Sequence, residues 1–101
     1  MDKETARVVK KFAKRIRKAH NIQKVILFGS RARGDQFRTS DYDFFIVSKD
    51  FSGMRAPARM TRMLEFWNER RDLETICFTP EEFERRKPLM KGILSKAVEI
   101  S

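Results

Sequence analysis

Apolar residues recur along the chain in short runs and at helical spacing, and each pattern predicts one type of element. Residues 3–20 carry apolar positions three or four residues apart among lysines and arginines, which is typical of an amphipathic helix. These apolar positions are Val8, Phe12, Ile16 and Ala19. The run KVILF at 24–28 ends at a glycine and predicts a strand buried on both faces. The run DYDFFIV at 41–47 predicts a second strand.

The second half of the chain predicts a helix and a third strand. Residues 48–56 have the composition of a loop, and Pro57 then stands where a first helical residue would. Apolar residues continue from there at helical spacing, and we expect this stripe to lie in the core. The stripe consists of Met60, Met63, Leu64 and Trp67. RDLETICF at 71–78 predicts the third strand.

The clearest helix start lies in TPEEF, where Thr79 as N-cap and Glu82 three residues later form a capping box. Pro88 and Gly92 break that helix, and a last helical segment at 93–98 would face the core. Its apolar residues are Ile93, Leu94, Ala97 and Val98. This order of elements predicts an α/β (α+β) fold, a small mixed sheet covered by helices. No repeat or linker interrupts the chain, so we expect one domain spanning 1–101.

The composition narrows the class of protein. Hydrophobic content is 41%, and no apolar run approaches the roughly 20 residues that a membrane span requires. The N-terminal residues lack the apolar stretch of a secretion signal. A single cysteine, Cys77, excludes an internal disulfide and a multi-cysteine zinc site. We therefore expect a cytoplasmic protein that does not associate with membranes.

The charge balance points to anionic partners. The chain has 23 Lys and Arg residues against 14 Asp and Glu residues, a net charge of +9. A field of that sign favours nucleotides, nucleic acid or an acidic protein surface. It argues against a cationic small molecule as substrate.

Two aspartates, Asp41 and Asp43, stand at the start of the second predicted strand. Side chains alternate along a strand, so both carboxylates would point to the same side and repel each other. A divalent cation resolves that conflict, and Mg²⁺ typically takes one or two carboxylates together with phosphate oxygens and water. The pair therefore predicts a magnesium site.

The turn after the first strand predicts a phosphate site. Gly29 permits a close approach of the backbone, and Ser30 begins a short helical turn whose amides and hydroxyl could bind an anion. Arg31 and Arg33 could add charge-assisted contacts, and Gly34 ends the turn. A phosphate cradle beside an acidic pair predicts metal-assisted transfer from a nucleoside triphosphate.

A second metal ion, or a base for the attacking hydroxyl, needs a third carboxylate on a neighbouring strand. Asp72 and Glu74 share a face of the third predicted strand, so either could point at the aspartate pair. We favour Glu74 because it lies deeper in the strand, and Asp72 remains the alternative.

The segments GSRARG, SDYDFFIV and LETICFTPEEFE together resemble the minimal nucleotidyltransferase (MNT) family of the DNA polymerase β-like superfamily. The resemblance implies a nucleotidyltransferase fold like the palm of polymerase β. It implies that Gly29 and Ser30 hold the β- and γ-phosphates of ATP, and that Asp41 and Asp43 bind Mg²⁺, two ions in all. It places Glu74 where many members have an aspartate as third carboxylate.

The resemblance also implies a partner. Small members of this family are often antitoxins of HEPN-domain proteins, and some transfer AMP from ATP to a tyrosine of that toxin. A partner chain or a second copy of this chain would complete the site. A non-catalytic module that binds a nucleotide or a partner is the alternative. Nucleotide addition to RNA is a weaker one, because the chain offers no obvious RNA-binding appendage.

Overall fold

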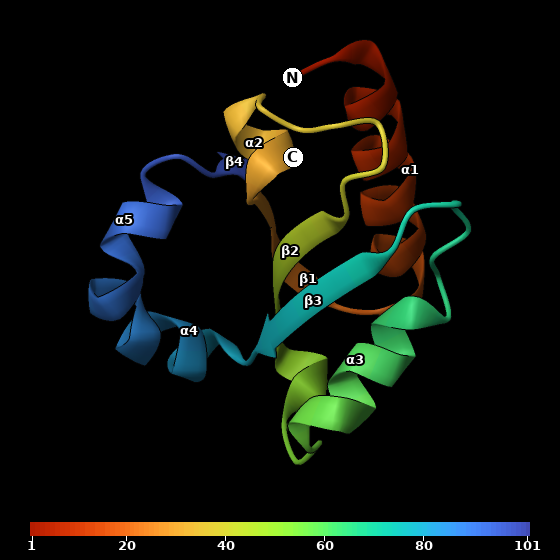
Figure 1. Cartoon of the computed structure of the whole chain (residues 1–101). Helices are drawn as coiled ribbons and strands as arrows, with labels where there is room; N and C mark the ends of the chain where they lie inside the picture. The colour runs from red at the N-terminus through yellow and green to blue at the C-terminus, as the bar shows by residue number, and fades with distance from the viewer.

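A four-stranded mixed sheet forms the centre of the protein, which is described by a computed structural model over residues 1–101. The strands follow the order β3-β2-β1-β4 across the sheet. β1 pairs antiparallel with β2 and with β4, and β2 pairs parallel with β3 (Figure 1). The strands are β1 (Ile22–Phe28), β2 (Tyr42–Ser48), β3 (Leu73–Phe78) and β4 (Val98–Glu99). β3 and β4 are therefore the two edges of the sheet.

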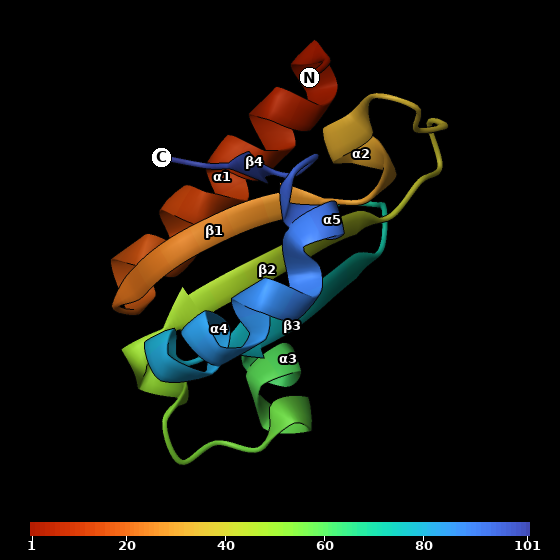
Figure 2. The ribbon, with the colours of Figure 1, turned by 90° about the vertical axis from the view of Figure 1, so that its left-hand side faces the viewer.

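Helices cover both faces of the sheet (Figure 2). α1 (Lys3–Ala19) and α3 (Ala56–Leu64) pack on one face, and α4 (Pro80–Arg86) with α5 (Lys91–Leu94) packs on the other. A short helix, α2 (Ser30–Arg33), follows β1, and two 3₁₀ turns, η1 (Lys49–Phe51) and η2 (Lys87–Met90), lie in connections. No helix has both the length and the apolar character that would let it cross a membrane. The arrangement confirms the predicted α+β class.

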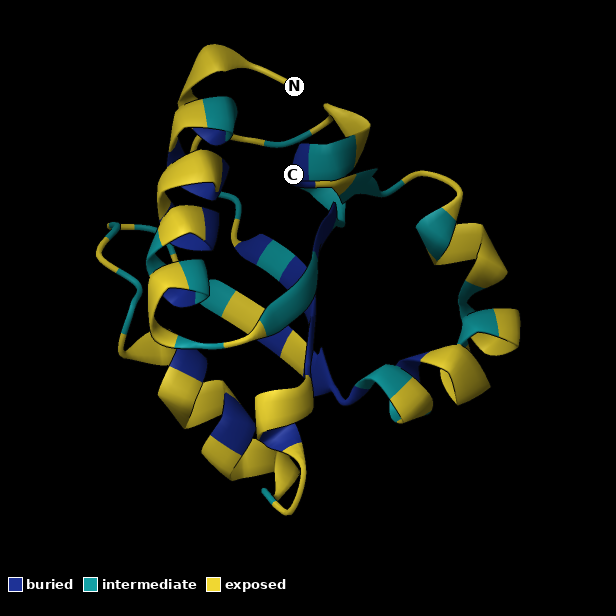
Figure 3. Cartoon of the chain, turned by 180° about the vertical axis from the view of Figure 1, so that it is seen from behind, coloured by how far each residue is buried: buried dark blue, intermediate teal, exposed yellow.

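The core lies on both sides of β2. Phe44 and Ile46 of this strand face α1, where Phe12 and Ile16 are buried, while Phe45 faces α4. Burial on the two faces explains the nearly unbroken apolar run of this strand. Exposed residues lie mainly on the outward sides of the helices (Figure 3). β2 is thus paired on both sides and packed on both faces.

Local signals in the sequence set the start of two helices. The side chain of Asp2 accepts a hydrogen bond of 2.8 Å from the amide of Thr5 at the start of α1. Thr79 and Glu82 form the predicted capping box, in which the Glu82 carboxylate accepts a 2.8 Å hydrogen bond from the Thr79 amide. The prediction of this helix start is confirmed.

The predicted stripe after Pro57 is wrong in part. α3 ends at Leu64, so Trp67 lies beyond it, where its ring packs against Phe12 and Tyr42. Met63 is buried, whereas Met60 and Leu64 are 48% and 54% exposed. α3 turns the side that carries Arg59 and Met63 toward the core, so Met60 and Leu64 lie outside it.

The predicted last helix is also wrong in part. α5 ends at Leu94, and Val98 belongs instead to β4, a two-residue strand whose partner is Leu27 of β1. Ile93, which we expected in the core, is 48% exposed. Pairing with a distant strand decides the structure of these residues, and no local periodicity reports such pairing.

Candidate functional site

Asp43 and Glu74 lie side by side on neighbouring strands. The register of the sheet pairs Phe28 of β1 with Asp43 of β2, and Asp43 with Glu74 of β3. Paired residues point to the same face of a sheet, so these three side chains form one row. Asp43 is half-buried and Glu74 is exposed. The structure therefore brings together two of the three carboxylates expected from the sequence.

The environment of Asp43 disfavours its charge. Burial is the largest cause that raises the pKa of this carboxyl, to about 6 from an ordinary value of 3.8. A hydrogen bond with Glu74 and the negative charges of Glu74 and Asp41 raise the pKa further, while Arg33 lowers it. A cation placed beside the pair would relieve this repulsion. The electrostatics of the site thus favour a bound positive charge.

Gly29 lets this carboxylate approach the turn after β1. The residue has φ of 78°, a left-handed conformation that side chains disfavour. A Cβ atom added there would collide with Oδ2 of Asp43 and would stand 3.2 Å from its Cγ. Only glycine therefore permits the turn to lie directly against Asp43, and the turn and the carboxylate form one site.

The turn itself offers unpaired amides. Helical hydrogen bonding in α2 begins with the amides of Ala32 and Arg33, which both donate to the Gly29 carbonyl. The amides of Ser30 and Arg31 precede these donors and have no partner in the helix. Ser30 is half-buried, and Gly34 closes the turn with φ of 84°. The groups that we expected to hold phosphate thus lie beside Asp43.

Arg31 does not fit the phosphate role that we expected, because its guanidinium is buried among protein acceptors. Its side chain donates to the hydroxyl of Thr5 at 2.9 Å, to the carbonyl of Arg38 at 3.2 Å and to the carbonyl of Ser40. The guanidinium also lies 4.1 Å over the ring of Tyr42. Arg31 therefore joins α1, the loop after α2 and β2, and it has no free face for a ligand.

Arg33 is the arginine of the turn that remains accessible. Its side chain is 45% exposed and pairs with Asp35 at 3.2 Å, an ion pair at the surface. It lies close enough to Asp43 to lower the pKa of that carboxyl. An exposed ion pair of this kind is weak, so Arg33 is free to turn toward an anion.

The two remaining acidic candidates lie just outside the strands. Asp41 immediately precedes β2 and Asp72 immediately precedes β3, and both are exposed. Asp41 raises the pKa of Asp43 by its charge, whereas Asp72 contributes a backbone carbonyl that accepts a hydrogen bond from the Tyr42 amide. Of the two residues weighed as third carboxylate, Glu74 is the one beside Asp43.

The donor set suits a magnesium ion that is shared with a nucleotide. No three His, Cys, Asp or Glu side chains converge closely enough to hold a metal ion, so Asp41, Asp43 and Glu74 do not form a preformed centre. Mg²⁺ needs only one or two carboxylates where substrate phosphates and water supply the remaining ligands. The Asp43–Glu74 pair, with its repulsion and its place beside the turn, meets that requirement.

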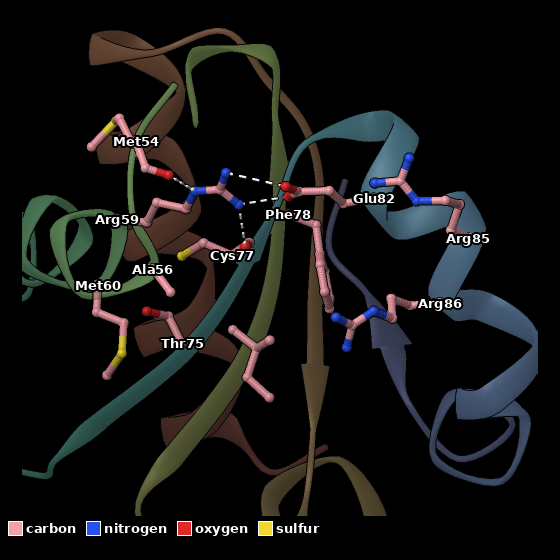
Figure 4. A pocket seen from close by; sticks show the side chains of 11 residues that line it. Met54, Ala56, Arg59, Met60, Thr75, Cys77, Phe78, Glu82, Arg85 and Arg86 are labelled. Atoms are coloured by element: carbon pink, nitrogen blue, oxygen red, sulfur yellow. Dashed lines mark hydrogen bonds and ion pairs between the residues drawn. The ribbon is translucent and has the colours of Figure 1, made fainter. Parts of the chain in front are cut away.

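Sequence reasoning missed a buried arginine and the groove beside it. Arg59 of α3 donates to the carbonyls of Met54 and Cys77, both at 3.0 Å, and pairs with Glu82 at 2.6 Å. It borders a cavity of about 590 Å³ that lies along β3 rather than at the Asp43 site (Figure 4). Met60 and Leu64, which are exposed beside this groove, were visible in the sequence as apolar residues, but their helical spacing led us to expect them in the core.

Comparisons with known proteins agree with this architecture. The chain matches the family model described as "Nucleotidyltransferase domain" over residues 9–99. It is similar to a crystal structure of a candidate nucleotidyltransferase from Sulfolobus solfataricus, with 26% identity and a TM-score of 0.68. That match covers 92% of this chain and 76% of the other. A comparison with curated proteins gave no match. The sheet, the turn and the family model lead to one conclusion: the chain belongs to the nucleotidyltransferase domain family.

Proposed function

We propose that the protein transfers AMP from ATP to an acceptor hydroxyl in a reaction that requires Mg²⁺. One observation carries the proposal: Asp43 and Glu74 meet in register, directly against a turn that only glycine can form. Membership of the nucleotidyltransferase family supports the general reaction. The positive net charge of +9 supports an anionic donor.

Two groups of residues would bind two parts of the substrate complex, the phosphates and the magnesium ions. The amides after Gly29 and the hydroxyl of Ser30 would hold the β- and γ-phosphates, with Arg33 as an additional contact. Asp43, Asp41 and Glu74 would hold Mg²⁺, up to two ions, which when bound supply positive charge to the phosphates. Asp43 would remain ionised in that state.

The transfer is a substitution at the α-phosphorus of ATP. The acceptor oxygen forms a bond to that atom while the bond to the pyrophosphate oxygen breaks. The proton of the acceptor passes to Glu74, whose exposed carboxylate lies next to Asp43. Pyrophosphate leaves on the side of the glycine turn.

The acceptor that we propose is a tyrosine of a HEPN-domain partner, in which case the protein acts as an antitoxin. The resemblance of GSRARG and SDYDFFIV to minimal nucleotidyltransferases supports this part of the proposal. The site is also open at Glu74 and Asp41, so a second chain has room to complete it. We propose a cytoplasmic location on the same grounds.

A non-catalytic binding module is the second candidate function. The three expected carboxylates do not form a preformed metal centre, and this observation favours it. Such a module would keep the fold and the nucleotide site but would neutralise its partner by contact alone. RNA as acceptor is a further alternative, and a gel-shift series across salt concentrations would reveal it.

Calorimetric titration of ATP into the protein, with Mg²⁺ and with EDTA, tests nucleotide binding. We expect binding that requires Mg²⁺ and is lost in Asp43→Asn, while Asp72→Asn, a nearby exposed control, binds as wild type does. Transfer from α-labelled ATP to a co-purified partner then tests the chemistry. Loss of transfer in Glu74→Gln with binding intact supports the enzyme. Unchanged transfer in both Asp43→Asn and Glu74→Gln would overturn the mechanism.

A further inference from the structure

α1 carries much of the positive charge of the protein. Eight of the 23 Lys and Arg residues lie in this helix, beside a single acidic residue, Glu4. Lys10, Lys14 and Lys18 follow one another at intervals of four residues, so their side chains form a row on one side of the helix. All three are exposed, whereas the apolar side of α1 is buried against the sheet (Figure 3). This lysine row therefore faces solvent.

The stability of the helix does not explain the lysine row. Like charges four residues apart in a helix repel each other and destabilise it. Other exposed basic side chains have an acidic neighbour nearby in the chain, as Arg62 has Glu65 and Lys87 has Glu84. No ion pair of the protein includes a lysine of the row. An anion bound to the row would relieve its repulsion.

A hollow of about 440 Å³ lies beside the row and has no apolar wall. It is lined by Lys10, Lys14, Arg17, Lys18 and Ser101. The Arg17 side chain donates a hydrogen bond of 2.9 Å to the carbonyl of Ile100, which holds its guanidinium in place. The other N–H groups of this guanidinium have no partner in the protein and can donate to an anion. The hollow therefore combines four cations, one of which is a fixed planar donor.

The chemistry of this surface distinguishes between anionic partners. The centre of a protein interface is usually apolar, and this hollow has no apolar residue. A helix that binds a lipid surface inserts its apolar side chains, whereas those of α1 lie in the core. The phosphates of a nucleic acid need only cations and N–H donors. A single row favours one strand over a duplex, in which two strands present phosphates across a groove.

We propose that the lysine row and Arg17 bind the sugar–phosphate backbone of a single-stranded nucleic acid. Each of the four cations would contact a phosphate, and the lack of aromatic side chains in the hollow predicts no base preference. Asp43 shares its face of the sheet with Phe45, which packs on the α4 side. The strand would therefore lie on the opposite side of the sheet from the nucleotide site, and its binding does not depend on nucleotide transfer.

Fluorescence anisotropy of a labelled oligouridine dodecamer, measured across a salt series without ATP, tests the proposal. Four contacts to a single strand predict a slope of about −2.8 in log affinity against log salt, and a loss of about fiftyfold between 50 and 200 mM salt. Lys10→Gln/Lys14→Gln removes two contacts and should reduce the slope by about half. Arg85→Gln/Arg86→Gln, an equal loss of charge at two exposed residues of α4, should leave the slope unchanged.

Competition separates this surface from the nucleotide site. ATP with Mg²⁺, added at constant ionic strength, should not displace the oligouridine, and displacement would overturn the proposal. An equal effect of the two double variants would reflect net charge alone and would also overturn it. So would equally tight binding of an oligoglutamate of the same length, which would indicate an acidic protein as partner. Loss of ATP binding with oligouridine binding intact would count against the proposed transfer only.

Discussion

The carboxylate of Asp43 lies in the space that a side chain on residue 29 would occupy. Its Cγ stands 3.2 Å from the position of a Cβ on Gly29, and its Oδ2 would collide with that atom. The glycine of the turn and the aspartate of the strand are therefore a matched pair. A change at either residue should alter the other half of the site.

Gly29→Ala should abolish nucleotide binding and destabilise the fold. The backbone strain of a left-handed residue costs about 1 to 2 kcal/mol, and the collision with Asp43 adds to it. Gly34→Ala is the matched control, since Gly34 has φ of 84° but no atom within 4 Å of an added Cβ. Chemical denaturation and ATP titration of both variants measure the difference. Equal loss of affinity in the two would contradict a contact role for Gly29.

Asp43→Asn should stabilise the metal-free protein at neutral pH while removing activity. The pKa of Asp43 is raised to about 6, so the folded state binds more protons than the unfolded state between about pH 4 and 6. The wild type therefore loses stability as pH rises through this window, and the loss is complete above it. We expect a gain of about 1 to 2 kcal/mol in the variant, allowing for solvent screening.

Thermal unfolding in EDTA at pH 4 and at pH 7.5 tests this expectation for Asp43. The advantage of Asp43→Asn should be small at the lower pH and largest at the higher pH. At pH 7.5, excess Mg²⁺ with ATP should make the wild type more stable than Asp43→Asn, because only the wild type is stabilised by binding the ligand. If Asp43→Asn is less stable than the wild type in EDTA at both pH values, the charge of Asp43 does not destabilise the fold as we expect.

Glu82 should make the protein sensitive to acid. The hydrogen bond from Arg59 is the largest cause that lowers the pKa of Glu82, to about 2 from an ordinary 4.5. A lowered folded-state pKa contributes stability above pH 4.5 that is lost as pH falls toward 2. Glu82→Gln should be less stable than wild type near pH 6 and should show a shallower decline across the acid window. A pH series of urea denaturation compares the slopes, and parallel curves would disprove the link.

Substitution of Arg31 should lower the stability of the fold, whereas substitution of Arg33 should lower the affinity for ATP. Arg31→Lys removes a buried fork of donors and should cost about 2 to 4 kcal/mol, because Thr5 and the Ser40 carbonyl lose their partners. Arg33→Lys should leave stability within about 0.5 kcal/mol, since the side chain is exposed. Arg33→Ala should weaken ATP binding without unfolding the protein. Full affinity in that variant would exclude Arg33 from the phosphate site.

Local signals allowed much of the fold to be predicted from the sequence. The capping box at Thr79, the glycine that ends β1 and the two apolar strands depend on neighbours within a few residues. The spacing of Gly29 and Asp43 also pointed to one site, because adjacent strands bring such residues together. The deeper position of Glu74 in its strand favoured it over Asp72, which lies on the same face, and the register of β2 with β3 pairs Glu74 with Asp43.

Contacts between distant segments account for what the sequence did not reveal. The turn composition suggested that Arg31 was free, but Thr5 of α1 and the carbonyl of Ser40 bury it. Trp67 packs on Phe12, more than fifty residues earlier, and Val98 becomes a strand only because β1 offers an edge. Helical spacing at Met60 and Leu64 marked an apolar stripe but could not show that no element covers it.

The ion pair between Arg59 and Glu82 has a consequence for the behaviour of the protein at high concentration. Arg59 donates to the Cys77 carbonyl at the edge of the sheet and is held there by Glu82. Thr75, the preceding residue whose peptide groups point to this edge, is only 4% exposed. The edge strand is therefore covered by side chains of its own chain, which is one way in which proteins prevent strands of other molecules from pairing with an edge. Loss of Arg59 would uncover the Cys77 carbonyl and should favour such pairing at high concentration.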